Sequence, residues 1–273
     1  MTSLSSLASQ ETLRPCAIIA HRGASRQAPE NTLAAARRAW DLGSDGVEID
    51  IRLSRDGEIV VIHDATTRRT TGKNHAVSSL TARELHQLNA AAAFGNSPLF
   101  EPVPLLKQIL ATVPPGRRLV IEIKDNVPEM LDALDGTLRQ SGLSPDQIIL
   151  GTFDCNFAAQ AKRRFPAHEA LWINGDHQNA ATRDWPEVTR TLIAQTVASG
   201  LDGLDIGCCH SYNPALFFPH LQKIREAGLK LLVWTVNDPA KAALLRSLPV
   251  DGITTDVPEK LIPQENPAAP RTI

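Results

Sequence analysis

Short apolar runs alternate with stretches of helical periodicity along most of this chain of 273 residues. The runs with the length and composition of β-strands lie at residues 17–20, 47–53, 59–62, 119–124, 148–153, 170–173, 203–206, 231–236 and 252–255. The helical stretches lie at residues 31–42, 105–113, 128–141, 157–165, 186–199, 214–227 and 239–248. Repeated strand–helix alternation is typical of parallel β-structure with crossover helices. So many repeats favour a closed barrel over an open sheet, and we predict a single α/β domain, a (β/α)8 TIM barrel, over residues 14–262.

The strand candidates number nine, whereas a (β/α)8 barrel needs eight. Only residues 54–58 separate the second candidate from the third, and they contain the turn pair Asp56-Gly57. Because a parallel crossover needs about a dozen residues or more, this pair is predicted to be an early antiparallel β-hairpin that adds one strand to the barrel. Residues 65–101 then interrupt the alternation, apart from a short helix near 81–88, and predict a small insertion over one barrel face. The tails, residues 1–13 and 263–273, are predicted to be flexible.

The charge balance excludes several classes of partner. Lysine and arginine total 28 and aspartate and glutamate total 30, so the net charge is −2, and aromatic residues make up only 4%. Binding to nucleic acid or to an anionic membrane is therefore not expected. The four cysteines are too few and too scattered for a disulfide framework. Since we find no secretory signal and no run of about 18 apolar residues, we predict a cytoplasmic protein without a transmembrane segment.

Acidic residues interrupt two predicted strands that are otherwise apolar. Side-chain alternation puts Glu48 and Asp50 on one face of the second strand, and it pairs Glu122 with Lys124 on one face of the fourth. In a barrel the apolar face packs under the helices, so the three carboxylates would point inward, where burial and mutual repulsion disfavour their charge. A hard divalent cation, Mg²⁺ or Ca²⁺, would relieve this, because both ions prefer oxygen ligands.

Two histidines also follow predicted strands, at the edge where barrel enzymes place their active sites. His21 is followed by Arg22, and His63 is followed by Asp64. Beside a cation, two imidazoles suggest a general acid and a general base, while Arg22 and Lys124 could bind an anion. Together these groups predict a site for a phosphate ester. Each has a simpler interpretation, since a histidine at a strand end is commonly a packing residue and Arg22 could form an ion pair with the inward carboxylates.

No other motif competes with this cluster of strand-end residues. The sequence contains no GxxxxGK[ST] phosphate-binding loop, no GxGxxG, no GxSxG nucleophile elbow and no HExxH. The remaining histidines show no spacing typical of metal ligands, and we interpret them as surface or capping residues. The predicted chemistry therefore depends on the residues that follow the early strands.

The order of these motifs resembles the glycerophosphodiester phosphodiesterase family. The segments that carry the resemblance are His21-Arg22-Gly23, Pro29-Glu30-Asn31-Thr32, Glu48-Ile49-Asp50, His63-Asp64, Arg69-Thr70-Thr71, Glu122-Ile123-Lys124, Val233-Trp234-Thr235-Val236-Asn237 and Asp251-Gly252-Ile253-Thr254-Thr255-Asp256. They extend over residues 18–261, nearly the whole chain. Each segment alone is a weak signal, but their order and spacing are highly specific.

The resemblance implies a TIM-barrel phosphoric diester hydrolase that converts glycerophosphodiesters to glycerol 3-phosphate and an alcohol. It also implies one divalent cation, commonly Mg²⁺ or Ca²⁺, as cofactor, and a small-molecule phosphodiester as the partner. By position, the resemblance assigns roles to a set of residues: the metal ligands Glu48, Asp50 and Glu122, the acid and base His21 and His63, the phosphate-binding Arg22 and Lys124, and Trp234 on the glycerol side of the pocket. The sequence leaves open which histidine is the acid.

Other functions also stay open at this point. The same chemistry could act on lysophospholipids, as a lysophospholipase D does, or on a sugar-phosphate diester, and an apolar groove near the metal would favour a lipid. The phenylalanines that could line such a groove, although each is more typical of a core, are Phe94, Phe100, Phe153, Phe157, Phe217 and Phe218. The non-enzymatic alternative is a barrel that only binds a phosphorylated ligand. The complete set of two histidines and three carboxylates argues against it.

Overall fold

The strands of the chain close into a barrel. The structure, a computed structural model, describes residues 16–95, 99–175, 185–207 and 214–262, without the side chains of residues 185–186 and 214–218. Its strands are β1 (Ala17–His21), β2 (Gly46–Leu53), β3 (Ile59–Val61), β4 (Arg118–Ile123), β5 (Ile148–Thr152), β6 (Glu169–Asn174), β7 (Gly203–Gly207), β8 (Lys230–Trp234) and β9 (Gly252–Thr255). They are ordered β1-β9-β8-β7-β6-β5-β4-β2-β3, and β1 also pairs with β2. All strands except β3 therefore form one closed parallel ring, which confirms the predicted (β/α)8 TIM barrel.

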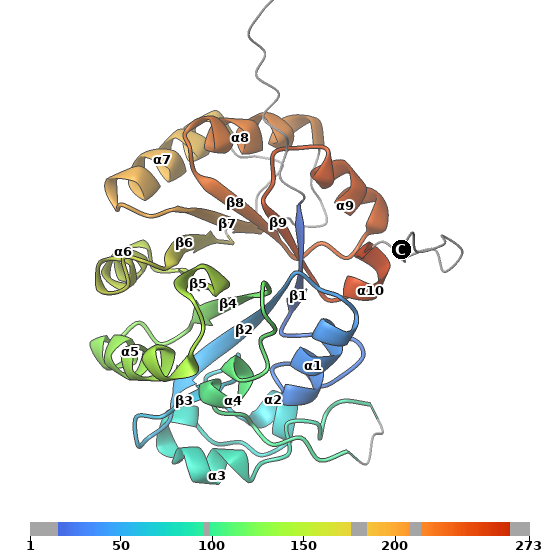
Figure 1. Ribbon diagram of the computed structural model, residues 1–273, viewed down its shortest axis with the longest axis vertical. Coiled ribbons are helices and arrows are strands. Elements are labelled where there is room, and N and C mark those ends of the chain that lie inside the picture. Colours follow the sequence, from blue (N-terminus) through green and yellow to red (C-terminus); the bar gives the residue numbers. More distant parts are fainter. Residues whose placement is uncertain (1–15, 96–98, 176–184, 208–213, 263–273) are drawn as a thin grey trace, which may run out of the picture.

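Helices surround this ring (Figure 1). They are α1 (Leu33–Asp41), α4 (Leu106–Leu110), α5 (Pro128–Ser141), α6 (Cys155–Arg164), α7 (Trp185–Ala198), α8 (Pro214–Glu226), α9 (Pro239–Arg246) and α10 (Pro258–Leu261), with a 3₁₀ turn, η2 (Pro145–Gln147), before β5. Outward strand residues such as Ile49 and Leu231 belong to the large apolar clusters under the helices. Their neighbours on the inner face, among them Val120 and Leu232, form a smaller cluster inside the ring. The period of two along each strand thus separates an outer core from an inner one.

The strand β3 lies outside the ring, as the short 54–58 connection predicts. It runs antiparallel to β2, with Val61 opposite Ile51 and Ile59 opposite Leu53. The tight turn between them needs Gly57, whose φ of +78° lies in the left-handed region that glycine adopts at little cost. Because successive side chains alternate, Ile59 and Val61 join the barrel core while Val60 joins a second apolar cluster.

That second cluster is the core of the predicted insertion. The segment after β3 forms α2 (Arg68–Thr71), the 3₁₀ turn η1 (Val77–Ser79) and α3 (Ala82–His86). Thr81 caps α3 in a reciprocal arrangement with Glu84, which confirms a short helix there, although it ends two residues before the predicted limit at residue 88. The insertion packs against Val60 of β3 and the adjacent Ile62, and its first helix contacts the site through Arg69.

Some predicted boundaries are wrong. The helix predicted from residue 31 begins at Leu33, because the Thr32 hydroxyl caps it by accepting from the Ala35 amide at 3.2 Å. The strand predicted over 231–236 ends at Trp234, and the predicted helix over 105–113 spans only Leu106–Leu110. The predicted flexible tails, 1–13 and 263–273, lie outside the described residues. None of the described helices is long and apolar enough to cross a membrane.

Candidate active site

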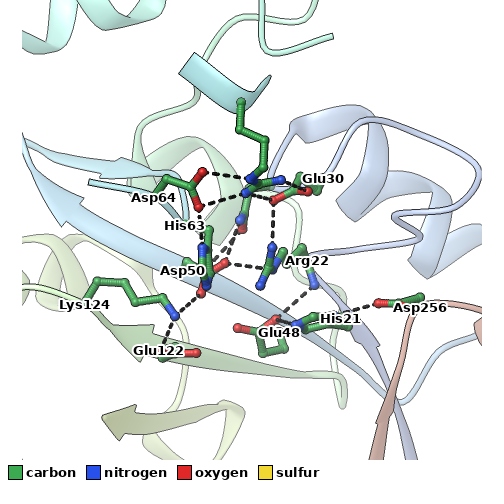
Figure 2. A network of polar contacts seen from close by, with 12 residues as sticks. His21, Arg22, Glu30, Glu48, Asp50, His63, Asp64, Glu122, Lys124 and Asp256 are labelled. Atoms are coloured by element: carbon green, nitrogen blue, oxygen red, sulfur yellow. Dashed lines mark hydrogen bonds and ion pairs between the residues drawn. The ribbon is translucent and has the colours of Figure 1, made fainter. Parts of the chain in front are cut away.

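The predicted site residues gather at the carboxyl end of the barrel, and Figure 2 shows all of them except Trp234. His21 ends β1, Glu48 and Asp50 lie on β2, and His63 follows β3. Glu122 and Lys124 come from the end of β4, and Trp234 ends β8. One cavity is lined by His21, Arg22, Glu48, His63, Glu122, Lys124 and Trp234. Asp50, the remaining predicted residue, is fully buried and forms ion pairs with Arg22 and Lys124 of that lining.

A left-handed turn after β1 positions the backbone of Arg22. Arg22 has φ +56° and Gly23 has φ +80°, and a Cβ atom on Gly23 would lie 2.5 Å from the backbone carbon of Ala35. Only glycine fits against the start of α1 at this point. The turn aims the Arg22 amide at the Glu48 carboxylate, to which it donates at 3.0 Å. The His-Arg-Gly sequence is thus explained locally by close packing and by this hydrogen bond.

The three inward carboxylates form a compact group of potential metal ligands. Glu48, Asp50 and Glu122 each offer an oxygen, and these oxygens all lie within 4.8 Å of one another. Among the residues that the structure describes, Oε1 of Glu48 is buried without a hydrogen-bond partner. An unpaired buried oxygen beside two further carboxylates is unfavourable unless a cation binds there. The donor set, all oxygen and all carboxylate, fits a hard divalent cation such as Mg²⁺ or Ca²⁺.

The carboxylates differ in their affinity for protons. Burial, and then repulsion from Asp50, raises the pKa of Glu48 well above its usual value and the pKa of Glu122 to about 7. Burial also acts on Asp50, but the charges of Lys124 and Arg22 outweigh it and lower the Asp50 pKa. The cluster therefore keeps one firmly ionised carboxylate and two that take up protons readily in the absence of a cation.

Stability of the metal-free protein should fall as pH rises from about 4.5 to about 7, because of Glu122. The pKa of Glu122 is raised from 4.5 to about 7 in the folded chain. Burial of Glu122 therefore does not lower the free energy of unfolding below pH 4.5, and it lowers that free energy by the full amount above the folded pKa. The shift corresponds to roughly 3 kcal/mol. Urea unfolding in chelator at pH 5 and pH 7.5 measures this, and Glu122→Gln should remove that part of the pH dependence. The surface variant Glu58→Gln should keep it, whereas equal pH dependence in Glu122→Gln and wild type would contradict the assignment.

Both predicted phosphate-binding cations are ion-paired with the carboxylates. Lys124 Nζ lies 3.0 Å from Asp50 Oδ1 and also pairs closely with Glu122. Arg22 Nε lies 3.2 Å from Asp50 Oδ2, and its Nη1 donates to Glu30 at 2.9 Å. The simpler interpretation of Arg22 as an ion-pair partner is thus observed. Despite these ion pairs, both Arg22 and Lys124 line the cavity.

Each histidine is oriented by a carboxylate. His21 Nδ1 lies 2.7 Å from Asp256 Oδ1, and His63 Nδ1 lies 2.6 Å from Asp64 Oδ1. A carboxylate at Nδ1 fixes the ring and leaves Nε2 for a second partner. For His21, that second nitrogen lies 3.9 Å from Glu48 Oε2, beside the carboxylate cluster. Burial is the main reason why the pKa of His63 is lowered.

The insertion contributes one residue, Arg69, to this arrangement. From α2, Arg69 donates to Asp64 Oδ2 at 2.7 Å and to Glu30 Oε2 at 2.6 Å. The hydrogen bonding and charge of Arg69, together with those of His63, lower the pKa of Asp64 to about 2. Glu30 in turn accepts from Arg22, so one chain of charged contacts joins the His63 side of the site to the Arg22 side (Figure 2).

Sequence reasoning assigned no role to several residues that the structure places here. Asn31, with φ +58°, donates to Asp50 Oδ2 at 2.7 Å and accepts from the Asp50 amide at 3.1 Å. Asp256 orients His21 and is itself held by Asn237 at 2.7 Å. Asn31 and Asp256 stand in segments that carry the family resemblance, and this was the only available signal. Val120, Ile173, Asp205 and Thr254 also line the cavity, as does Phe153, which the sequence had indicated as a candidate for an apolar groove.

Aromatic side chains form one wall of the cavity. The Phe153 and Trp234 rings meet edge to face, with centroids 5.8 Å apart, and Lys124 Nζ lies 5.7 Å from the Phe153 centroid. Of the other phenylalanines considered for an apolar groove, Phe157 is buried in the core under the helices. Phe100 is exposed and is not part of the cavity lining. The side chains of Phe217 and Phe218 lie outside the described residues.

Comparison with known proteins agrees with this geometry. Residues 21–260 match the model of the Glycerophosphoryl diester phosphodiesterase family. A glycerophosphodiester phosphodiesterase of Caldanaerobacter subterraneus subsp. tengcongensis is 31% identical over 252 residues, which cover 90% of this chain and 96% of the relative.

Solved structures show the same fold. A phosphodiesterase of Oleispira antarctica, solved in complex with the product sn-glycerol-3-phosphate, superposes with a TM-score of 0.76 at 28% identity, over 90% of this chain and 95% of that one. A glycerophosphodiester phosphodiesterase of Thermotoga maritima gives a TM-score of 0.71 at 25% identity, over 90% and 96% of the two chains. With a family match that spans the whole barrel and a relative above 30% identity along nearly its full length, this chain belongs to the glycerophosphoryl diester phosphodiesterase family.

Proposed function

We propose that the protein hydrolyses glycerophosphodiesters to glycerol 3-phosphate and an alcohol, with one divalent cation as cofactor and two histidines as acid and base. The family match and the named relatives identify it as a phosphoric diester hydrolase. The observation that carries the mechanism is geometric: two imidazoles, each oriented by a carboxylate, line the same cavity as Glu48 and Glu122. The product in the Oleispira antarctica complex supports sn-glycerol 3-phosphate as the product here.

The carboxylate cluster would hold the cation. Glu48, Asp50 and Glu122 supply the oxygens, and a bound Mg²⁺ or Ca²⁺ would offset negative charge on the phosphate oxygens during the reaction. Arg22 and Lys124 would bind further phosphate oxygens from the same cavity. Asp50 already holds the Arg22 and Lys124 side chains in place before substrate binds. Little reorganisation of these two side chains would therefore be needed when charge develops on the phosphate.

The histidines would transfer the protons. In each histidine, Nδ1 contacts the orienting carboxylate, so Nε2 is the nitrogen available for proton transfer. A lowered pKa favours the neutral ring of His63, which is the form that a general base needs, so we assign His63 to take the proton from the attacking water. His21, beside Glu48, would then protonate the leaving alkoxide.

A small substrate panel tests this function. Glycerophosphocholine, its acylated analogue and a sugar-phosphate diester are each assayed with Mg²⁺, Ca²⁺ and Mn²⁺, with and without chelator. We expect turnover of the water-soluble glycerophosphodiester with release of glycerol 3-phosphate, and loss of that turnover in chelator. Faster turnover of the acylated diester would favour a lysophospholipase D instead. Ligand uptake without any chelator-sensitive turnover would indicate a binding protein and contradict the proposal.

A further inference from the structure

The cavity extends from the carboxylate cluster to the opposite side of the ring. There, Asp205 on β7 and Thr254 on β9 line it, with Trp234 on the intervening strand β8 between them. Both polar residues are buried, with 5% of Asp205 and 2% of Thr254 exposed. Their side chains therefore face the interior of the site, away from bulk solvent.

Neither side chain has its hydrogen-bonding capacity satisfied. Within the described part of the chain, Oδ1 of Asp205 and Oγ1 of Thr254 are buried without a hydrogen-bond partner. The backbone carbonyl of Asp205 accepts from Trp234 Nε1 at 3.3 Å, so this hydrogen bond does not involve the Asp205 side chain. Buried polar groups in folded proteins are almost always paired, so two unpaired ones that share a cavity indicate a polar ligand.

The chemistry of the pair suits hydroxyl groups. Burial, and then the charge of Glu122, raises the pKa of Asp205 to about 8. A carboxyl group accepts hydrogen bonds in either protonation state, and a threonine hydroxyl both donates and accepts. The two side chains together can therefore bind the hydroxyl groups of an alcohol.

The position of the pair suits the glycerol part of the substrate. The metal-ligand candidates lie on β2 and β4, and His21 ends β1, which is the neighbour of β9 in the ring. A phosphate held by the carboxylate side would direct its substituent toward β7, β8 and β9. There the Trp234 ring offers an apolar surface for carbon atoms, and Asp205 and Thr254 offer partners for hydroxyl groups.

We propose that Asp205 and Thr254 bind the two free hydroxyl groups of the glycerol moiety and so determine the preference of this enzyme for glycerol over hydroxyl-free substituents. This inference rests on the proposed function, since it assigns part of the same site. A site whose buried polar groups are built for substrate hydroxyls rejects analogues that lack them, because binding such an analogue leaves those groups unpaired.

The test compares two ligands on the full chain in saturating Mg²⁺. Dissociation constants are measured by calorimetric titration for sn-glycerol 3-phosphate and for ethyl phosphate, which lacks the hydroxyls. Their ratio expresses the discrimination, and we expect at least tenfold preference for sn-glycerol 3-phosphate in wild type. Thr254→Val and Asp205→Leu, both close in size to the native residue, should each reduce this ratio about tenfold. Asp205→Asn, which keeps donor and acceptor groups, should restore the ratio to within about threefold of wild type.

Thr196→Val is the matched control, because Thr196 is equally buried but its hydroxyl donates within α7 to the Leu192 carbonyl at 2.6 Å. It should leave the ratio unchanged. Equal weakening of both ligands in Thr254→Val and Asp205→Leu, or no preference in wild type, would overturn the inference. Because the readout is binding, these outcomes are independent of turnover, whereas failure of wild type to hydrolyse any glycerophosphodiester would overturn only the proposed function.

Discussion

His21→Ala and His63→Ala are each expected to lower kcat by about 10²- to 10⁴-fold, the usual contribution of a general acid or base. The effect follows from the position of both rings, which are fixed by carboxylates at Nδ1 and line the cavity that holds the metal-ligand candidates. Steady-state kinetics on glycerophosphocholine measures the loss. Circular dichroism and thermal unfolding establish that each variant is folded.

His86→Ala provides the control for these two variants. His86 lies on α3 in the insertion, where its Nδ1 is 3.0 Å from the Val103 carbonyl, and it does not line the cavity. Its kcat should stay within about twofold of wild type. Turnover close to wild type in either His21→Ala or His63→Ala would refute the assignment of that histidine, whatever the behaviour of the other.

Removal of the divalent cation is expected to have an effect of similar size. Chelator should lower turnover at least about 100-fold, because the cation contributes several kcal/mol of charge stabilisation in the transition state. Returning Mg²⁺ or Ca²⁺ should restore activity. It should also stabilise the folded chain by about 2.7 kcal/mol at a free concentration of 100 times Kd, which thermal unfolding and calorimetric titration both detect.

Variants of the carboxylate cluster test whether the cation binds there. Glu48→Gln and Glu122→Gln keep the shape of each side chain but remove one anionic oxygen ligand, so cation binding and the accompanying stabilisation should both weaken. Glu58→Gln is the matched control, since Glu58 is an exposed side chain that lies 3.8 Å from Lys107 on the barrel surface. If Glu48→Gln and wild type took up the cation with equal affinity, the site would have to lie elsewhere.

The sequence was most informative where a structural or functional feature depends on a few consecutive residues alone. Period-two alternation places Glu48 and Asp50 inward because β2 is regular, and the predicted inward direction agrees with their burial. The five-residue connection 54–58 similarly identified β3 as an antiparallel addition, because no parallel crossover is that short. In both cases a local rule was sufficient, and no distant contact had to be known.

Residues that act through distant contacts could not be recognised in this way. Asp256 contacts His21 across 235 residues, and Arg69 reaches Glu30 across 39. Asp205 is the one charged residue of β7, and Thr254 is followed by a second threonine in β9, and both patterns also fit ordinary packing. Only the closure of the ring brings these side chains into one cavity. The boundary of α1 was misplaced for a related reason, because Asn31 is withdrawn from the helix to bond Asp50 on another strand.

The pairing of β1 with β9 has a consequence for biosynthesis. The ring closes only when the last strand meets the first, and the carboxylate that orients His21 follows that last strand. At about 5–20 residues per second, a ribosome needs on the order of ten seconds to a minute to make the intervening chain. Throughout that time the first histidine lacks its orienting partner. Under the proposed mechanism, a chain that lacks Asp256 therefore cannot hydrolyse its substrate efficiently, and catalytic competence requires translation through this residue.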